Sequence, residues 1–167
     1  MLLLLALAAP LTTVPNVDLN KYSGTWYEIA RLPNRFQKHC VSDVVANYTL
    51  NPNNTVAVVN SCMQVNGRTK TAEGVARVAG EAKDSNSILE VRFAPSFLSW
   101  LPFVWGDYRI LALGPNYEYA MVGTEDRKYL WILSREKAMS EALQKKLLAE
   151  AANLGFATSQ VVPTKQN

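Results

Sequence analysis

The chain has 167 residues, which corresponds to one domain at the usual domain size. Apolar residues make up 49% and charged residues only 19%, so the chain can bury a core and still leave apolar area for a cavity. The net charge is +3, and no run of basic residues occurs, which excludes the usual sequence pattern of a nucleic-acid-binding domain.

The chain begins with an apolar segment, Met-Leu-Leu-Leu-Leu-Ala-Leu-Ala-Ala. Ala6 and Ala8 flank Leu7 in the small-x-small pattern of a signal-peptide cleavage site. The segment is too short to cross a bilayer, which takes about 20 apolar residues. We therefore expect residues 1–15 to be an export signal or N-terminal extension and residues 16–167 to form a single domain. The alternative is an N-terminus that is buried or frayed.

After the start, short segments rich in Val, Ile, Thr and Tyr alternate with turn residues. They predict strands over residues 25–32, 43–50, 55–63, 68–78, 88–94, 107–113, 117–123 and 129–134. Strong turn sequences, such as Asn51-Pro52-Asn53-Asn54 and Asn66-Gly67, separate them. Since no helix is predicted between the strands, they should form an antiparallel meander that closes into a barrel and so removes its edges.

A helix is predicted after the last strand, because Ser140 is a good N-cap residue and Gly155 suits the position after a helix. The apolar residues that recur at helical spacing between them are Leu143, Leu147, Ala151 and Leu154. Their common face should pack on the outside of the barrel. The predicted fold class is therefore all-β, an eight-stranded antiparallel up-and-down β-barrel with a C-terminal α-helix packed on the outside.

Three segments resemble, in the same order, the three signature motifs of the lipocalin family. Residues 24–31 read GTWYEIAR, residues 106–108 read GDY, and residues 129–135 read YLWILSR. The residues of these motifs are similar to those of bacterial lipocalins, apolipoprotein D and plant temperature-induced lipocalins. The resemblance covers residues 17–162. It implies a barrel whose interior holds one small ligand.

The resemblance also implies structural roles for Gly24, Trp26, Asp107 and Arg135. In the family the residue matching Trp26 plugs the closed end of the barrel, and the residue matching Arg135 packs across it. A guanidinium over an indole face contributes roughly 0.5–2 kcal/mol. None of these residues is expected to be catalytic.

Side chains alternate between the two faces of a strand, so one face of each strand should line the barrel. Taking Trp26 as inward, we predict a ligand-binding lining of Glu28, Tyr48, Val58, Val91, Phe93, Tyr108, Tyr119, Met121 and Trp131. Most are apolar or aromatic, and the tyrosine hydroxyls could orient a polar head group. The alternative is that several of them fill the barrel or face the helix, because a slip of one residue inverts a strand.

Cys40 precedes the second predicted strand and Cys62 ends the third, and the hairpin between them brings the two close. We predict a Cys40–Cys62 disulfide, as expected of an exported chain. A catalytic thiol is the alternative, because one lipocalin branch is an isomerase that uses a cysteine. We interpret His39 as a surface residue. Two cysteines and one histidine are too few for a convincing structural zinc site, and we expect no metal or cofactor.

Residues 93–105 form an uncharged connection after Arg92 that contains Pro95 and Pro102. Its large apolar residues are Phe97, Leu98, Trp100, Leu101 and Phe103. Such a patch is unfavourable in water and often marks a membrane contact. We predict a membrane-docking loop, and the alternative is a lid over the barrel mouth.

These observations predict an exported, non-enzymatic protein that transports or stores a lipophilic ligand, such as a fatty acid or lysophospholipid, in the cell envelope. It would lie in the periplasm or at the outer-membrane surface of a bacterium, or outside a eukaryotic cell. Peripheral membrane contact is expected and nucleic-acid binding is not. The sequence allows a homodimer but does not decide between monomer and dimer. The alternatives are a lipocalin-fold enzyme acting on a lipophilic substrate, and a haem or pigment binder with His39 as the axial ligand.

Overall fold

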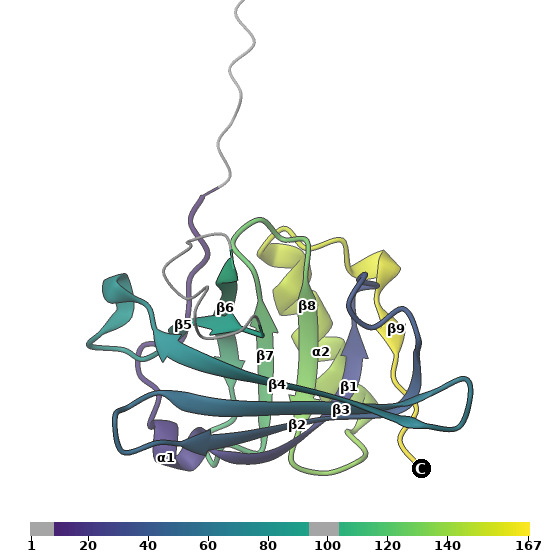
Figure 1. Cartoon of the computed structure of the whole chain (residues 1–167). Coiled ribbons are helices and arrows are strands. Elements are labelled where there is room, and N and C mark those ends of the chain that lie inside the picture. The colour runs from purple at the N-terminus through teal and green to yellow at the C-terminus, as the bar shows by residue number, and fades with distance from the viewer. Residues whose placement is uncertain (1–8, 94–103) are drawn as a thin grey trace, which may run out of the picture.

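The computed structural model describes residues 9–93 and 104–167, and within them the chain forms one closed antiparallel barrel (Figure 1). The barrel strands are β1 Gly24–Arg31, β2 Cys40–Leu50, β3 Val56–Gln64, β4 Thr69–Val78, β5 Ile88–Arg92, β6 Gly106–Leu113, β7 Tyr119–Gly123 and β8 Leu130–Ser134. The remaining elements are α1 Leu19–Tyr22, η1 Gly80–Ala82, α2 Glu141–Asn153, η4 Thr158–Gln160 and β9 Val162–Pro163.

Consecutive strands pair from β2 through β8. β1 pairs with both β8 and β2, so the sheet closes on itself. This confirms the predicted eight-stranded barrel with its C-terminal helix. Most strand starts differ from the prediction by one or two residues, and the largest difference is in β2, which begins at Cys40 rather than Asp43. Asp43 has a φ of 52° and lies at an irregularity in the β2–β3 register, so the strand continues through a bulge.

The seam between β1 and β2 is completed by the C-terminal segment, which the sequence analysis did not predict. β1 and β2 pair only from Gly24 to Tyr27. Beyond that point β9 pairs with β1, and the Gln166 amide donates to the carbonyls of Glu28 on β1 and Val44 on β2. The last residues of the chain therefore fill the gap left where the two strands diverge.

Two cores share the sheet. The inner core includes Trp26, Ile110 and Val122, all fully buried inside the barrel. The outer core lies between the sheet and α2, where Leu147 and Ala151 are fully buried (Figure 1 shows α2 behind β7 and β8). Strands that contact both cores are apolar on both faces.

The segment before α1 lies against the barrel. Leu11 is buried in the outer core, and Val17 is fully buried in the inner core. The backbone amide of Val14 donates to the carbonyl of Ile110. Residues 11–17, which precede α1, therefore contact both cores of the barrel.

The predicted disulfide is confirmed, since Cys40 is bonded to Cys62 with a Cα–Cα distance of 5.6 Å. It joins the start of β2 to β3 and closes a loop whose ends are 22 positions apart. A cross-link of this span removes conformational entropy from the unfolded chain.

Replacing both cysteines, Cys40→Ala with Cys62→Ala, should lower the free energy of unfolding by about 3 kcal/mol, because the loop is then free in the unfolded chain. Urea unfolding followed by tryptophan fluorescence measures this loss. The wild-type chain under reducing conditions should shift by a similar amount. An unchanged urea midpoint in both samples would contradict the prediction.

Candidate functional site

One end of the barrel is closed by Arg135 and Trp26. The Arg135 guanidinium lies 3.8 Å from the centre of the Trp26 ring and donates to the carbonyls of Lys21, Tyr22, Ser23 and Thr25. Trp26 is fully buried, and its indole N–H donates to the Tyr22 carbonyl. The end of β8, helix α1 and the start of β1 are thereby fixed together.

Gly24 and Asp107 support the barrel ends in different ways. Gly24 has a φ of +101°, and a Cβ there would lie 3.3 Å from Nη1 of Arg135, so a side chain would strain the backbone beside the guanidinium. The Asp107 carboxylate accepts from Nε of Arg109 and from the backbone amide of Glu125. It therefore fixes the turn between β7 and β8, at the opposite, open end.

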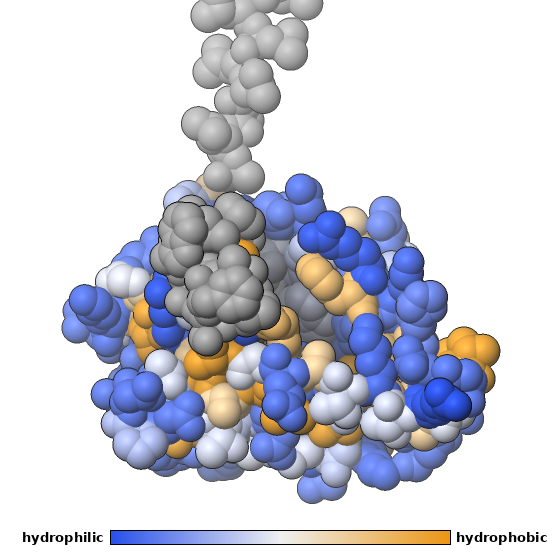
Figure 2. Space-filling model, in the orientation of Figure 1, coloured by the Kyte–Doolittle hydropathy of each residue, from blue (hydrophilic) through white to orange (hydrophobic). Residues whose placement is uncertain are grey.

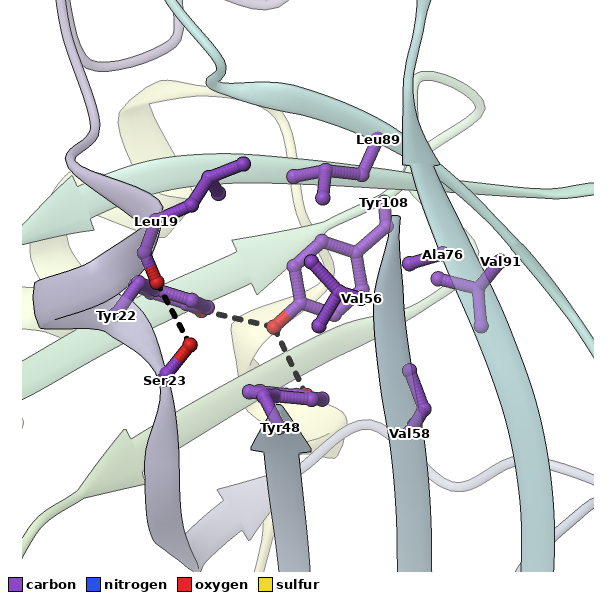
Figure 3. Close-up of a pocket in the computed structure, with 10 residues that line it drawn as sticks. All are labelled: Leu19, Tyr22, Ser23, Tyr48, Val56, Val58, Ala76, Leu89, Val91 and Tyr108. Carbon is purple, nitrogen blue, oxygen red and sulfur yellow. Dashed lines mark hydrogen bonds between the residues drawn. The ribbon is translucent and has the colours of Figure 1, made fainter. Parts of the chain in front are cut away.

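A narrow pocket, partly open to solvent, lies inside the barrel near its closed end (Figure 3). Its walls come from α1 and from strands β2 to β6. The lining residues are Leu19, Tyr22, Ser23, Tyr48, Val56, Val58, Ala76, Leu89, Val91 and Tyr108. None of these is charged, so the pocket suits an apolar group.

Three tyrosine hydroxyls meet in this pocket. The Tyr108 hydroxyl lies 2.8 Å from that of Tyr22 and 3.0 Å from that of Tyr48, as the dashed lines in Figure 3 show. Two hydrogen bonds use two of the three hydroxyl protons and leave one for another acceptor. Burial raises the pKa of Tyr48 to about 12 and raises those of Tyr22 and Tyr108 well above 10. The hydroxyls therefore stay neutral donors at physiological pH.

Four of the predicted ligand-binding residues line this pocket: Tyr48, Val58, Val91 and Tyr108. Trp131 packs against the inner core but is placed toward the open end, where its indole N–H donates to the Gln37 side chain. Phe93 follows β5 with 48% of its surface exposed, and its ring lies beside Gly74.

Tyr119 and Met121 do not line the pocket, in contrast to the prediction. Met121 is fully buried in the outer core, and Tyr119 packs against the same cluster. The inward residues of β7 are instead Ala120 and Val122. Because both faces of this strand are apolar, hydrophobicity along the sequence could not decide which face points inward.

Glu28 also differs from its predicted role. Its side chain is almost completely buried, and its carboxylate accepts from Arg31 at 2.6 Å, from Gln37 at 2.6 Å and from the Thr164 hydroxyl. These partners lie on β1, on the loop after it and on the C-terminal segment. Glu28 thus fixes the seam of the barrel instead of lining the pocket.

Sequence analysis missed the contribution of α1. Leu19, Tyr22 and Ser23 line the pocket, but a helix of four residues has no apolar periodicity to detect. The remaining missed residues are Val56, Ala76 and Leu89. Val56 could have been predicted from the sequence, since it lies two residues before Val58 on the same strand and therefore on the same face.

The other candidates lie outside the pocket. His39 is exposed, and Cys40 is held in the disulfide. Residues 97–103, predicted to dock on a membrane, are outside the described residues. In the part of the chain that is described, no group of three or more His, Cys, Asp or Glu side chains could hold a metal, and no helix is long and apolar enough to cross a membrane.

Comparison with known proteins gives a family match over almost the whole chain. The model of the "Lipocalin-like domain" matches residues 17–166. Temperature-induced lipocalin-1 of Arabidopsis thaliana is 40% identical over 155 residues, which cover 92% of this chain and 82% of that protein. Outer membrane lipoprotein Blc of Escherichia coli K12 is 35% identical over 156 residues, covering 93% and 82%. Apolipoprotein D also matches, so the predicted branch is confirmed.

Among solved structures, insecticyanin from the tobacco hornworm Manduca sexta has a TM-score of 0.73 at 21% sequence identity, and the match covers 95% of this chain and 86% of that one. At this identity the likeness concerns the fold alone, and it agrees with the closed barrel and outer helix described above.

Replacing Arg135 with Lys should lower the free energy of unfolding by about 2 kcal/mol or more, because an ammonium cannot serve several carbonyls and an indole face at once. Urea unfolding measures the loss. Arg68→Lys, at an exposed position, is the matched control and should change stability by at most about 0.5 kcal/mol. Equal stabilities of the two variants would contradict the structural role of Arg135.

The protein should lose stability as the pH rises from about 10 toward 12. Unfolded tyrosines ionise near pH 10, whereas the raised pKa values keep the buried three protonated in the folded state, so the unfolded chain binds fewer protons. Urea unfolding at stepped pH measures the slope. Tyr108→Phe should flatten it and Tyr119→Phe, outside the pocket, should not. Equal slopes for both variants would argue against the burial of these hydroxyls.

Proposed function

Because the chain belongs to the lipocalin family, we propose that it binds one amphiphilic lipid in its barrel and transports or stores it without catalysing a reaction. A fatty acid or lysophospholipid is the proposed ligand. The observation that carries the proposal is the pocket inside the barrel, whose described lining is apolar except for hydroxyl groups. Apolar walls with a few placed polar groups are typical of small-molecule sites.

The apolar chain of the ligand should enter first, toward Trp26, and the head group should remain near the open end. A carboxylate or phosphate at the closed end would lose its hydration with no cation among the lining residues to replace it. The remaining proton of the tyrosine group suits a neutral acceptor instead, such as a carbonyl or hydroxyl oxygen.

Export to the cell envelope is part of the proposal. The relative from Escherichia coli is named an outer membrane lipoprotein, and the Cys40–Cys62 bond fits an oxidising compartment. Cleavage after Ala8 would leave Leu11 and its contacts with the barrel in the mature chain. Peripheral membrane contact through residues 97–103 is also proposed, on the basis of their composition alone.

The two alternatives have weaker support in the described residues. An isomerase that uses Cys40 as its nucleophile would first need the disulfide to be reduced. His39, the single histidine, is exposed and is not among the residues that line the pocket, so it is poorly placed to ligate a haem bound there.

The direct test is to purify the protein under mild conditions and measure its mass by native mass spectrometry before and after extraction with organic solvent. A fatty acid or lysophospholipid released near one per barrel would support the proposal. A protein that carries no lipid and fails to bind added long-chain fatty acid would overturn it.

Filling the pocket should weaken ligand binding. Val58 lines the pocket, whereas Val59, the next residue on β3, is 39% exposed. Val58→Phe should weaken the binding of a fluorescent long-chain fatty acid at least about tenfold, because one large side chain occupies much of a narrow pocket. Val59→Phe adds the same group outside and should bind like wild type. Equal affinities, with both variants folded by circular dichroism, would place the ligand elsewhere.

A further inference from the structure

Two segments at the open end of the barrel form a surface that the proposed function does not use. They are the residues around the β1–β2 connection, 35–41, and those around the β3–β4 turn, 65–70. The disulfide and the pairing of Cys40 with Gln64 fix the two segments together. The Lys70 ammonium also donates to the Phe36 carbonyl at 3.5 Å. We call the combined surface the basic rim.

The basic rim exposes large apolar side chains. Val65 is 81% exposed, Phe36 is 57% exposed and Val41 is 50% exposed, the three highest values among the large hydrophobic residues described. Figure 2 shows hydrophobic colour at the hairpin tip on the right of the molecule, on a surface that is mostly hydrophilic. Exposed apolar groups gathered in one place indicate a contact surface.

The exposed Phe36 is held in place and not left to collapse onto the surface. Its ring packs on Tyr129 with ring centres 5.6 Å apart, and Tyr129 stacks on Trp131 inside the open end. Phe36 therefore projects from a supported aromatic row, with its outer part in water. A partner that covers it would gain apolar burial at little cost in conformational entropy.

The same surface is strongly basic. Its exposed cations are Arg35, Lys38, Arg68 and Lys70, and the ion pairs found among the described residues involve none of them. Residues 32–42 and 63–72 contain no Asp or Glu. Of the carboxylates that follow or face these ranges, Glu28 is buried with Arg31 and Asp43 accepts from Asn167, whereas Glu73 on β4 is exposed. Four positive charges thus gather here on a chain whose net charge is only +3.

We propose that the basic rim docks the protein onto a membrane that contains anionic phospholipid. Each cation near such a surface contributes about 1 kcal/mol, and the projecting phenylalanine and valines insert at the headgroup boundary. Charge alone would suit any polyanion, but apolar side chains between the cations favour lipid over nucleic acid. The inference names a surface other than residues 97–103, and it holds or fails independently of what the barrel carries.

Docking in this way would turn the open end of the barrel toward the bilayer. Both rim segments lie at the end where β1 and β3 finish and β2 and β4 begin, opposite Trp26 and Arg135. If the proposed function holds, an amphiphile could then pass between membrane and barrel without crossing water.

Flotation of the full chain with vesicles tests the proposal. The vesicles are phosphatidylcholine alone, or phosphatidylcholine with added phosphatidylglycerol. Wild-type protein should bind the anionic vesicles about 100-fold more tightly than the neutral ones, and added salt should weaken the binding. The charge variant should lose that preference; it combines Arg35→Gln, Lys38→Gln, Arg68→Gln and Lys70→Gln. The apolar variant, Phe36→Ser with Val65→Ser, should bind about tenfold more weakly than wild type.

The matched control removes the same charge elsewhere and should bind within about threefold of wild type. It combines Lys21→Gln, Lys83→Gln, Lys145→Gln and Lys146→Gln, all at exposed positions. If the control and the charge variant lose equal affinity for anionic vesicles, the binding depends only on net charge and the proposal is overturned. Equal binding to both vesicle types would also overturn it, as would binding to heparin that matches vesicle binding and is unaffected in the apolar variant.

Fatty-acid binding, measured on every variant, separates the two proposals. Rim variants that bind fatty acid normally but fail to float support the docking surface. If the wild-type barrel binds no fatty acid but floats with anionic vesicles, the proposed function would be overturned and the docking proposal for the basic rim would still hold. If the charge variant with four substitutions does not fold, the double variant Lys38→Gln with Arg68→Gln removes two exposed charges. Unchanged vesicle affinity in the double variant would be evidence against docking.

Discussion

The barrel depends on the contact between Arg135 and Trp26. A guanidinium has five donors in a fixed plane, so one side chain covers an indole face and satisfies several carbonyls. Arg135 follows the last barrel strand and these partners lie in or just before the first, so the contact joins elements more than a hundred residues apart in sequence. The result is one closed end of the barrel, and the apolar pocket lies beside it.

Most of the fold could be predicted because its signals are local. Turn residues such as Asn51-Pro52-Asn53-Asn54 punctuate the strands, and Ser140 begins the helix by accepting the backbone amide of Leu143. The disulfide followed from the hairpin between its cysteines. What sequence could not supply is long-range: the pairing of β9 with β1 depends on two residues that carry no strand pattern of their own.

The site was predicted in part, and the errors have physical causes. Tyr48 was placed correctly because polar residues, Asn47 and Thr49, flank it on the other face of β2. β7 contacts both cores, so alternation could not distinguish Met121 from Val122. Glu28 has the inward position that alternation gives it, but its carboxylate binds groups from the seam, which only the folded chain brings together. Tyr22 was missed because its short helix is recognisable only against the barrel that it covers.

The seam of the barrel also constrains the order of folding. Residues 162–167 lie between β1 and β2, so the first and second strands complete their hydrogen bonding only with residues more than a hundred positions later in the chain. Contacts of such long sequence separation make folding slow. The β1–β2 hairpin therefore remains incomplete until the segment after α2 has packed against it.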